Sequence, residues 1–380
     1  MDKTILENNR QWIEKTWEKI DKKLQHTAKK SRNKIPYTTI DGIHDNKAET
    51  GPDWWTNGFW GAMMWLMWEQ TGNEEYKITA QEAEKLLDKA FLDIAKLHHD
   101  VGFMWHITSG ASYRLTGDMQ SKNREALAAA LLASRYNPDG GFIRAWNGDD
   151  AKGWSIIDCM MNIPLLYFMA KELNIPRYYK IAINHARMAV RDHIRPDGSV
   201  NHIVEHDMDT GEVVKIYGGQ GYNETSCWSR GLAWAVYGCV LSYIHTNEKE
   251  FLDAAIKTAN FFIANAKMTD YRPLADFRAP AEPAYYDSTA GVCTACALLE
   301  LSKYVSETEG ALYTNEAINL LKAADKYFCD YSENEDALVL MGTERYPNES
   351  MSGVHIPIIY GDFFFVEAMT KLRGSDFLIW

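Results

Sequence analysis

Two carboxylates have sequence surroundings that suit acid–base chemistry, and Asp158 is the first of them. It lies in Ile156-Ile-Asp-Cys-Met-Met-Asn-Ile-Pro164, and the next charged residue downstream is Lys171. Burial of a carboxyl group among Ile, Met and Leu disfavours its charged form, which suits a general acid. A buried aspartate whose oxygens accept backbone hydrogen bonds explains the same pattern, and the residues alone leave both interpretations open.

Asp100 is the second carboxylate, and it follows His98 and His99. We expect it in a loop that leads into an inner helix. His-His-Asp is a fragment of some metal sites, but adjacent helical residues cannot face one ion, and no second ligand pair has the required spacing. Cys293-Thr-Ala-Cys296 likewise lacks a second pair and is more typical of a packed helix face. We therefore expect no metal and no organic cofactor.

Arg230 and two tryptophans are candidates for binding a ligand. Arg230 is a lone cation in Ser226-Cys-Trp-Ser-Arg-Gly-Leu-Ala-Trp234, and a guanidinium there suits a uronic acid carboxylate. An arginine that binds loop carbonyls explains the segment equally well. Trp55 and Trp234 are expected near the entries of inner helices, where an indole ring can stack on a sugar.

A repeated pair of helices must position these residues. Polar breaks begin at Thr71, Thr116, Leu173, Thr246 and Thr308. Each follows a helix that is apolar nearly all round and precedes an amphipathic one. Expected inner helices span 60–69, 155–171 and 231–244, outer ones span 78–98 and 254–267, and terminal ones span 4–29 and 362–373. About twelve helices in six hairpins predict an all-α protein, a closed (α/α)6 barrel or α/α toroid, with 1–380 as a single catalytic domain and strands confined to loops such as 199–214.

Composition restricts the class of partner. The formal net charge of -12 argues against nucleic acid and against an anionic membrane. We find no run of about 18 apolar residues and no apolar N-terminal segment, so we expect neither a transmembrane helix nor a signal peptide. Six scattered cysteines favour reduced thiols and a cytoplasmic location. The sequence leaves the oligomeric state open.

Eight segments in order along the chain resemble the unsaturated glucuronyl hydrolases of glycoside hydrolase family 88. They include Trp55-Thr-Asn-Gly-Phe-Trp60 and Ile156-Ile-Asp-Cys159, and the others are 98–103, 141–146, 220–222, 226–234, 287–290 and 360–368. The resemblance implies a six-hairpin α/α barrel, with Asp158 as the acid/base and Asp100 as a second essential aspartate. The substrate-binding positions that it implies are Trp55, His99, His202, Gln220, Arg230 and Trp234.

The resemblance also implies the chemistry. The substrate is an oligosaccharide whose non-reducing terminal uronic acid carries a C4=C5 double bond, and no cofactor takes part. Asp158 protonates C4, water adds at C5, and the resulting hemiketal opens to release the next sugar. Two alternatives remain, namely an unsaturated galacturonyl (rhamnogalacturonyl) hydrolase on the same barrel and a non-catalytic sugar-binding toroid.

The loop 348–357 bears on specificity by analogy with the family. It lacks the Ser-rich, Lys-bearing form that some members use for sulfated fragments, and Ser350, Ser352 and His355 are its partial substitutes. Glu349 is its one charged residue besides a titratable histidine, so we expect unsulfated substrates to be preferred at pH 7. Protonation of His355 at lower pH is expected to narrow that preference.

Overall fold

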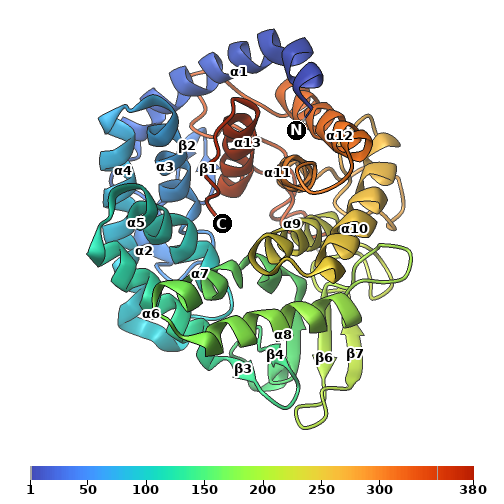
Figure 1. Cartoon of the computed structure of the whole chain (residues 1–380). Helices are drawn as coiled ribbons and strands as arrows, with labels where there is room; N and C mark the ends of the chain where they lie inside the picture. The colour runs from blue at the N-terminus through green and yellow to red at the C-terminus, as the bar shows by residue number, and fades with distance from the viewer. Residues whose placement is uncertain (1, 349) are drawn as a thin grey trace.

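Two concentric layers of helices form most of the computed structural model, which describes residues 2–348 and 350–380 (Figure 1). The inner layer contains α3 (Phe59–Thr71), the π-helical segment η2 (Gly102–Gly110) with its continuation α5 (Ala111–Thr116), α7 (Pro164–Glu172), α9 (Ser229–Thr246), α11 (Ser288–Leu301) and α13 (Ile359–Leu372). The outer layer contains α1 (Lys3–Lys30), α4 (Glu74–Leu87), α6 (Met119–Ser134), α8 (Pro176–Asp192), α10 (Lys249–Lys267) and α12 (Glu307–Tyr327).

The inner helices close into a ring. Each packs on the next in chain order, and α13 returns to pack on α3, while α1 contacts both α12 and α13. All residues of α11 and α13 are buried, whereas the amphipathic α8 buries one face and exposes the other. The chain is thus an (α/α)6 barrel, as the repeat predicted.

The polar breaks are the turns from inner to outer helices. Gly72 and Gly117 end α3 and α5 with φ of 66° and 76°, a left-handed conformation that glycine adopts without strain. Asn73 and Asp118 then cap α4 and α6 by accepting a backbone N–H. The break expected at Thr308 is displaced, because α12 already begins at Glu307 behind the N-cap Ser306.

Short strands and turns fill the loops that precede the inner helices. The described strands are β1 (Thr39–Ile40), β2 (Ile43–His44), β3 (Tyr136–Asn137), β4 (Phe142–Ile143), β5 (Trp154–Ile156), β6 (Ile203–His206) and β7 (Val213–Tyr217). The remaining short helices are α2 (Lys47–Thr50), η1 (Asp88–Lys96), η3 (Asp149–Ala151) and η4 (Ile157–Met161). β5, β6 and β7 form an antiparallel sheet in which Ile156 pairs with Ile203, so Asp158 and His202 flank paired strands.

Two expected helices were wrong in extent. The segment 155–171 begins as β5 and the 3₁₀ turn η4, and the α-helix starts only at Pro164, whose missing N–H suits a first helical position. The outer helix expected over 78–98 ends at Leu87 and continues as η1, which is kinked at Asp93. Asp158 therefore lies on a short turn, and His98 to Asp100 lie outside any helix.

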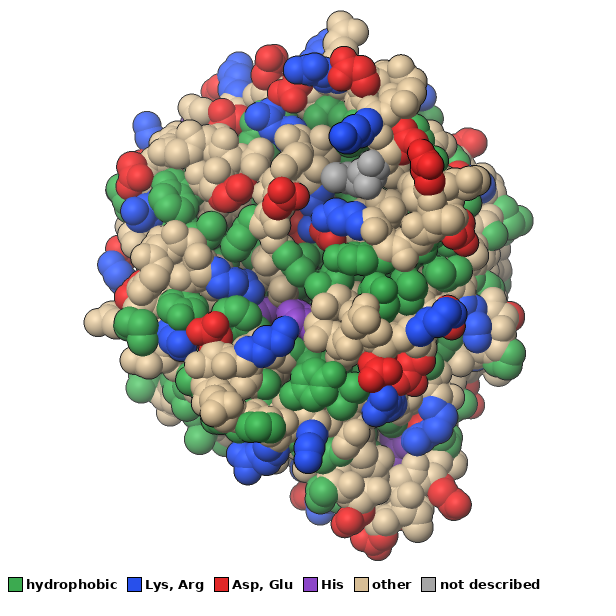
Figure 2. All heavy atoms as spheres, in the orientation of Figure 1, with side chains coloured by type: hydrophobic (Ala, Val, Ile, Leu, Met, Phe, Trp, Pro, Cys, Tyr) green, Lys and Arg blue, Asp and Glu red, His purple; other side chains and the backbone are tan. Residues whose placement is uncertain are grey.

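No described helix is long and apolar enough to cross a membrane. On the face seen in Figure 2, acidic and basic side chains are interspersed.

Candidate active site

A cavity of about 520 Å³ opens where the inner helices begin. Its wall includes the tips of loops and the first turns of helices: Tyr37, Asp53, Trp54, Trp55, Ala95, Lys96, His98, His99, Asp100, Trp146, Asn147, Ile156, Asp158, Gln220, Trp228, Arg230, Glu344, Arg345 and Tyr360. The expected residues Trp55, His99, Asp100, Asp158, Gln220 and Arg230 are among them. The positive ends of the inner-helix dipoles lie on this side of the barrel, which favours an anionic ligand.

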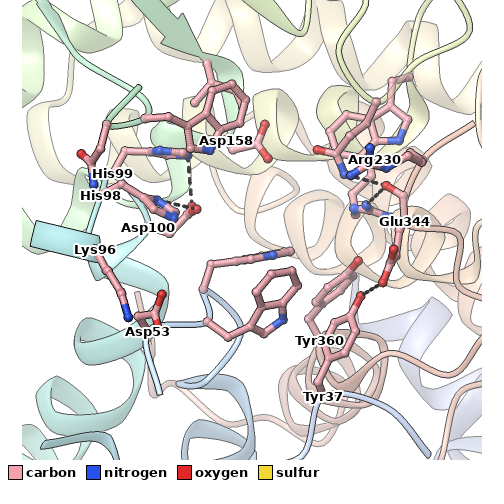
Figure 3. Close-up of a pocket in the computed structure, with 18 of the residues that line it drawn as sticks. Tyr37, Asp53, Lys96, His98, His99, Asp100, Asp158, Arg230, Glu344 and Tyr360 are labelled. Carbon is pink, nitrogen blue, oxygen red and sulfur yellow. Dashed lines mark hydrogen bonds and ion pairs between the residues drawn. The ribbon is translucent and has the colours of Figure 1, made fainter. Parts of the chain in front are cut away.

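The cavity has two facing groups of polar side chains (Figure 3). His98, His99, Asp100 and Asp158 lie on one side, and Arg230, Glu344, Tyr37 and Tyr360 lie on the other.

Asp158 is nearly buried, with 8% of its surface exposed, and its closest ionisable neighbour is a histidine. Asp158 Oδ1 lies 3.4 Å from His202 Nε2. His202 Nδ1 accepts the Gln220 backbone N–H at 2.9 Å, so the proton of a neutral imidazole is on Nε2 and faces Asp158. His202 itself does not line the cavity, and neither its Nε2 nor Asp158 Oδ1 has a hydrogen-bond partner within the described part of the protein.

Asp100 is held by three groups. His98 Nδ1 and His99 Nε2 lie 3.3 and 3.2 Å from its oxygens, and the Asn162 amide donates to Oδ1 at 3.2 Å. Burial alone raises the pKa of Asp100, but the two histidines and the amide together outweigh it, and the pKa is lowered. We therefore expect Asp100 to be ionised at neutral pH.

His98, His99 and Asp100 do not lie on a helix, so the expectation against a metal there rested on a wrong premise. The segment is a turn, and one ligand atom from each residue lies within 4.8 Å of the others. The N–O separations of 3.3 Å for His98 and 3.2 Å for His99 are also those of ion pairs with Asp100 in the absence of a metal. The donor set alone is compatible with either arrangement.

Arg230 lines the cavity but is already partnered. Its side chain is 1% exposed, and Nη1 donates to Asp287 Oδ2 at 2.8 Å and to the Thr343 carbonyl at 2.5 Å. Nη2 donates to the Glu344 carbonyl at 2.6 Å, and the guanidinium lies over the rings of Trp228 and Tyr360. Both interpretations offered by the sequence therefore have support, since the same group binds loop carbonyls and faces the cavity.

The aromatic wall differs from expectation at one position. Trp54, Trp55, Trp146 and Trp228 line the cavity, whereas Trp234 is fully buried and packs 5.3 Å from Phe103 between ring centroids. Trp234 was therefore wrongly placed in the wall. It lies more than a turn deeper into α9 than Arg230, and the residue that contacts the cavity is Trp228, just before the helix.

A second cavity of about 470 Å³ adjoins the first and shares Glu344 and Arg345 with it. Its other lining residues are Gly219, Tyr346, Asn348, Ser350 and Ser352, so the two serines line a cavity beside the first one, and their role in substrate binding stays a prediction. Glu349 lies outside the described residues.

His355 was expected from the sequence to bind substrate together with these two serines, and the structure places it elsewhere. It lies outside the walls of both cavities, where its Nε2 accepts the Tyr286 backbone N–H at 2.9 Å and its ring stacks on Tyr286. Burial lowers the pKa of His355. Arg345 precedes the loop 348–357, is exposed and lines both cavities. It was not singled out from the sequence.

Several further residues of the site were not singled out from the sequence. Trp146, Trp228 and Tyr360 lie inside segments that resemble the family, so their motifs gave a signal. Tyr37 and Glu344 lie in loops far apart in the chain, and the Tyr37 hydroxyl donates to the Glu344 carboxylate. No local pattern in the sequence marks that pair.

Comparison with known proteins places this geometry in a family. The model of Glycosyl Hydrolase Family 88 matches residues 19–251. The chain is 31% identical to the unsaturated chondroitin disaccharide hydrolase of Streptococcus pneumoniae, with 86% of this chain and 83% of that protein covered. It is also 31% identical to the unsaturated glucuronyl hydrolase of Bacillus sp. strain GL1, with 91% and 92% covered.

Solved structures agree with these matches. The unsaturated glucuronyl hydrolase from Bacillus sp. GL1 superposes with a TM-score of 0.88 at 27% identity, over 94% of this chain and 96% of that chain. An unsaturated glucuronyl hydrolase specific for heparin gives 0.87 at 29% identity, over 96% and 97%. On its fold, its cavity and these relationships, the chain belongs to glycoside hydrolase family 88.

Proposed function

We propose that this protein removes the non-reducing terminal 4,5-unsaturated uronic acid from oligosaccharides made by polysaccharide lyases. The observation that carries the proposal is a single cavity, in a family 88 barrel, that contains Asp158 and Asp100 together with Arg230 and a tryptophan wall. The relatives named above as unsaturated glucuronyl and chondroitin disaccharide hydrolases support the same substrate class.

Asp158 is the general acid and base of the proposed reaction. It donates its proton to C4, and positive charge develops at C5, where the ring oxygen delocalises it. The resulting carboxylate takes a proton from the water that adds at C5, which restores the acid. The hemiketal then opens and releases the next sugar, so the spacing rule for retaining and inverting carboxylate pairs does not apply. The step requires an acid and a water, and no metal or organic cofactor.

The residues around Asp158 have distinct proposed roles. The Nε2–H of His202 stabilises the Asp158 carboxylate that forms after proton transfer. The ionised Asp100 accepts hydrogen bonds from ring hydroxyls, and His99 and Gln220 form further hydrogen bonds with these hydroxyls. Trp55 stacks on the unsaturated ring. Arg230 binds the substrate carboxylate. Because Asp287 already offsets part of the arginine charge, the positive ends of the inner helices contribute to binding the same carboxylate.

A panel of unsaturated disaccharides tests the proposal. Products of chondroitin, hyaluronan, heparin, gellan and pectin lyases are incubated with the protein, and loss of the ultraviolet absorbance of the double bond is followed with and without a chelator. We expect turnover of at least one glucuronyl substrate that is unaffected by chelation. Turnover of the pectin product alone would favour the galacturonyl alternative. Binding of these sugars without loss of absorbance would favour the non-catalytic toroid.

Arg345 is proposed to set the tolerance for sulfate beyond the scissile bond. It is the exposed cation between the cavities, and the second cavity offers Ser350 and Ser352 as hydrogen-bond donors. Because Arg345 is exposed, we expect Arg345→Gln to lower kcat/KM for 6-sulfated chondroitin disaccharide only by roughly two- to fivefold relative to the unsulfated one. Side-by-side kinetics measure this ratio, and an unchanged ratio would exclude Arg345 from sulfate binding.

Two broader features belong to the proposal. The whole of 1–380 acts as one catalytic domain, since residues from near both ends, such as Tyr37 and Tyr360, line one cavity. A cytoplasmic location is supported by six free thiols, five of which are buried.

A further inference from the structure

Asn162 connects the Asp100 carboxylate to the backbone of Asp158. It is fully buried, and its Nδ2 donates at 3.2 Å to Asp100 Oδ1 and at 3.2 Å to the backbone carbonyl of Asp158. Its Oδ1 accepts the Phe103 backbone N–H at 2.8 Å. We propose that Asn162 is a positioning residue that fixes the Asp100 carboxylate relative to Asp158. This role rests on the proposed function.

The orientation of the Asn162 amide is determined by its neighbours. The Phe103 backbone N–H can only donate, so the amide oxygen faces it and the NH₂ group faces the two acceptors. Each amide hydrogen then has one acceptor. A primary amide alone among short side chains offers one acceptor and two donors in this plane. Aspartate would present an oxygen to two oxygens, and leucine would remove the hydrogen bond to each of the three partners.

The chain around Asn162 is built for close contact. Phe103 lies in η2, Asp158 lies in η4, and Asn162 follows η4, so one side chain joins two inner-helix entries. A Cβ added at Gly102 would lie 2.6 Å from Asn162 Cα and 2.8 Å from its Oδ1. Only glycine at 102 permits this approach. Gly102→Ala therefore displaces the Asn162 side chain while keeping its amide group.

The groups around position 162 make a carboxylate there sensitive to pH. Asp100 and Asp158 contribute negative charge, and His98 and His99 contact Asp100 from the same turn. The Cys159 thiol is buried, and that burial is the main reason why its pKa is raised. Arg135, at the C-terminal end of α6, contributes positive charge that interacts with Cys159 and Asp100. In Asn162→Asp two carboxylates would face each other, so one proton would be bound more tightly than in an isolated aspartate.

The test compares Asn162→Asp with Asn162→Leu across pH. At pH 8 we expect each variant to lose roughly 100-fold in kcat/KM, since hydrogen bonds to charged groups are lost. As pH falls to 5.5, a proton on the introduced carboxyl group would restore one donor to Asp100. The ratio of the Asn162→Asp variant to wild type should then recover at least tenfold, whereas the Asn162→Leu ratio should stay flat. A purely structural asparagine would give two flat ratios.

A glycine pair provides a matched control. Gly102→Ala should lower kcat/KM at all pH values. Gly61→Ala, whose added Cβ would lie 2.7 Å from Thr108 Cγ2 within the barrel, should lower the melting temperature while leaving kcat/KM within about fivefold. Circular dichroism of each variant reports whether the barrel is intact.

Melting temperatures separate this proposal from the proposed function, because they need no substrate. The proton shared by the carboxyl groups at positions 100 and 162 stabilises the folded Asn162→Asp variant at low pH, and that contribution is lost as pH rises. Its deficit against wild type should therefore widen from pH 5.5 to pH 8, and that of Asn162→Leu should not. Wild type without turnover would reject the proposed function alone. An unchanged deficit, or Asn162→Leu activity within fivefold of wild type, would overturn the role of Asn162.

Discussion

We expect Asp158→Asn to abolish turnover of the unsaturated disaccharide, with a loss of roughly 10²–10⁴ in kcat. Asparagine is nearly isosteric but cannot cycle a proton. The surroundings tolerate the change, because the bond from Asn162 reaches the backbone carbonyl of residue 158, which the substitution leaves unchanged. Loss of ultraviolet absorbance measures turnover, and calorimetric titration with the same disaccharide measures binding, which should persist.

Asp276→Asn is the matched control for loss of a buried carboxylate. Asp276 is 1% exposed and accepts the Cys227 and Tyr222 backbone N–H groups away from the cavity wall. Its variant should melt at a lower temperature and keep its turnover per folded molecule. An Asp158→Asn variant within about fivefold of wild type would remove Asp158 from the acid/base role.

The fold could be predicted from the sequence where its determinants are local. Gly72 and Gly117 end inner helices, Asn73 and Asp118 begin outer ones, and the contrast between apolar and amphipathic helices fixes the layers. The start of α7 could not be predicted in this way. The first residues of the helix expected over 155–171 instead belong to β5, which pairs with β6 about fifty residues downstream, and helical periodicity does not record such a partner.

The residues of the site also differ in whether local sequence or long-range packing determines their positions. Asp158 and Asp100 could be found because an isolated charge among apolar residues, and the family's motifs, mark them. Asn162 is only four residues after Asp158 in sequence, but its contact with Asp100 depends on the packing of η2 against the turn after η4. Trp234 and Trp228 differ by less than two helical turns, and only the position of the start of α9 decides which of them faces the cavity. The Tyr37 and Glu344 pair joins distant loops.

Arg230→Ala is the second change with a large expected effect, and it should act on both stability and binding. Arg230 and Asp287 form a fully buried pair, and removal of one partner of such a pair costs about 3–5 kcal/mol. The melting temperature should fall markedly. Loss of charged hydrogen bonds to the substrate carboxylate, each about 1.5–3 kcal/mol, should lower kcat/KM by roughly 10- to 150-fold.

A double variant separates the two contributions. In Arg230→Met with Asp287→Asn, the uncompensated buried charge is gone, and the asparagine oxygen can still accept the Thr289 and Thr343 backbone N–H groups that Asp287 Oδ1 binds. Stability should therefore recover most of its loss, while kcat/KM for the unsaturated uronate stays low. If kcat/KM recovered together with the melting temperature, Arg230 would hold loop carbonyls only, and the helix termini would have to bind the substrate carboxylate without it.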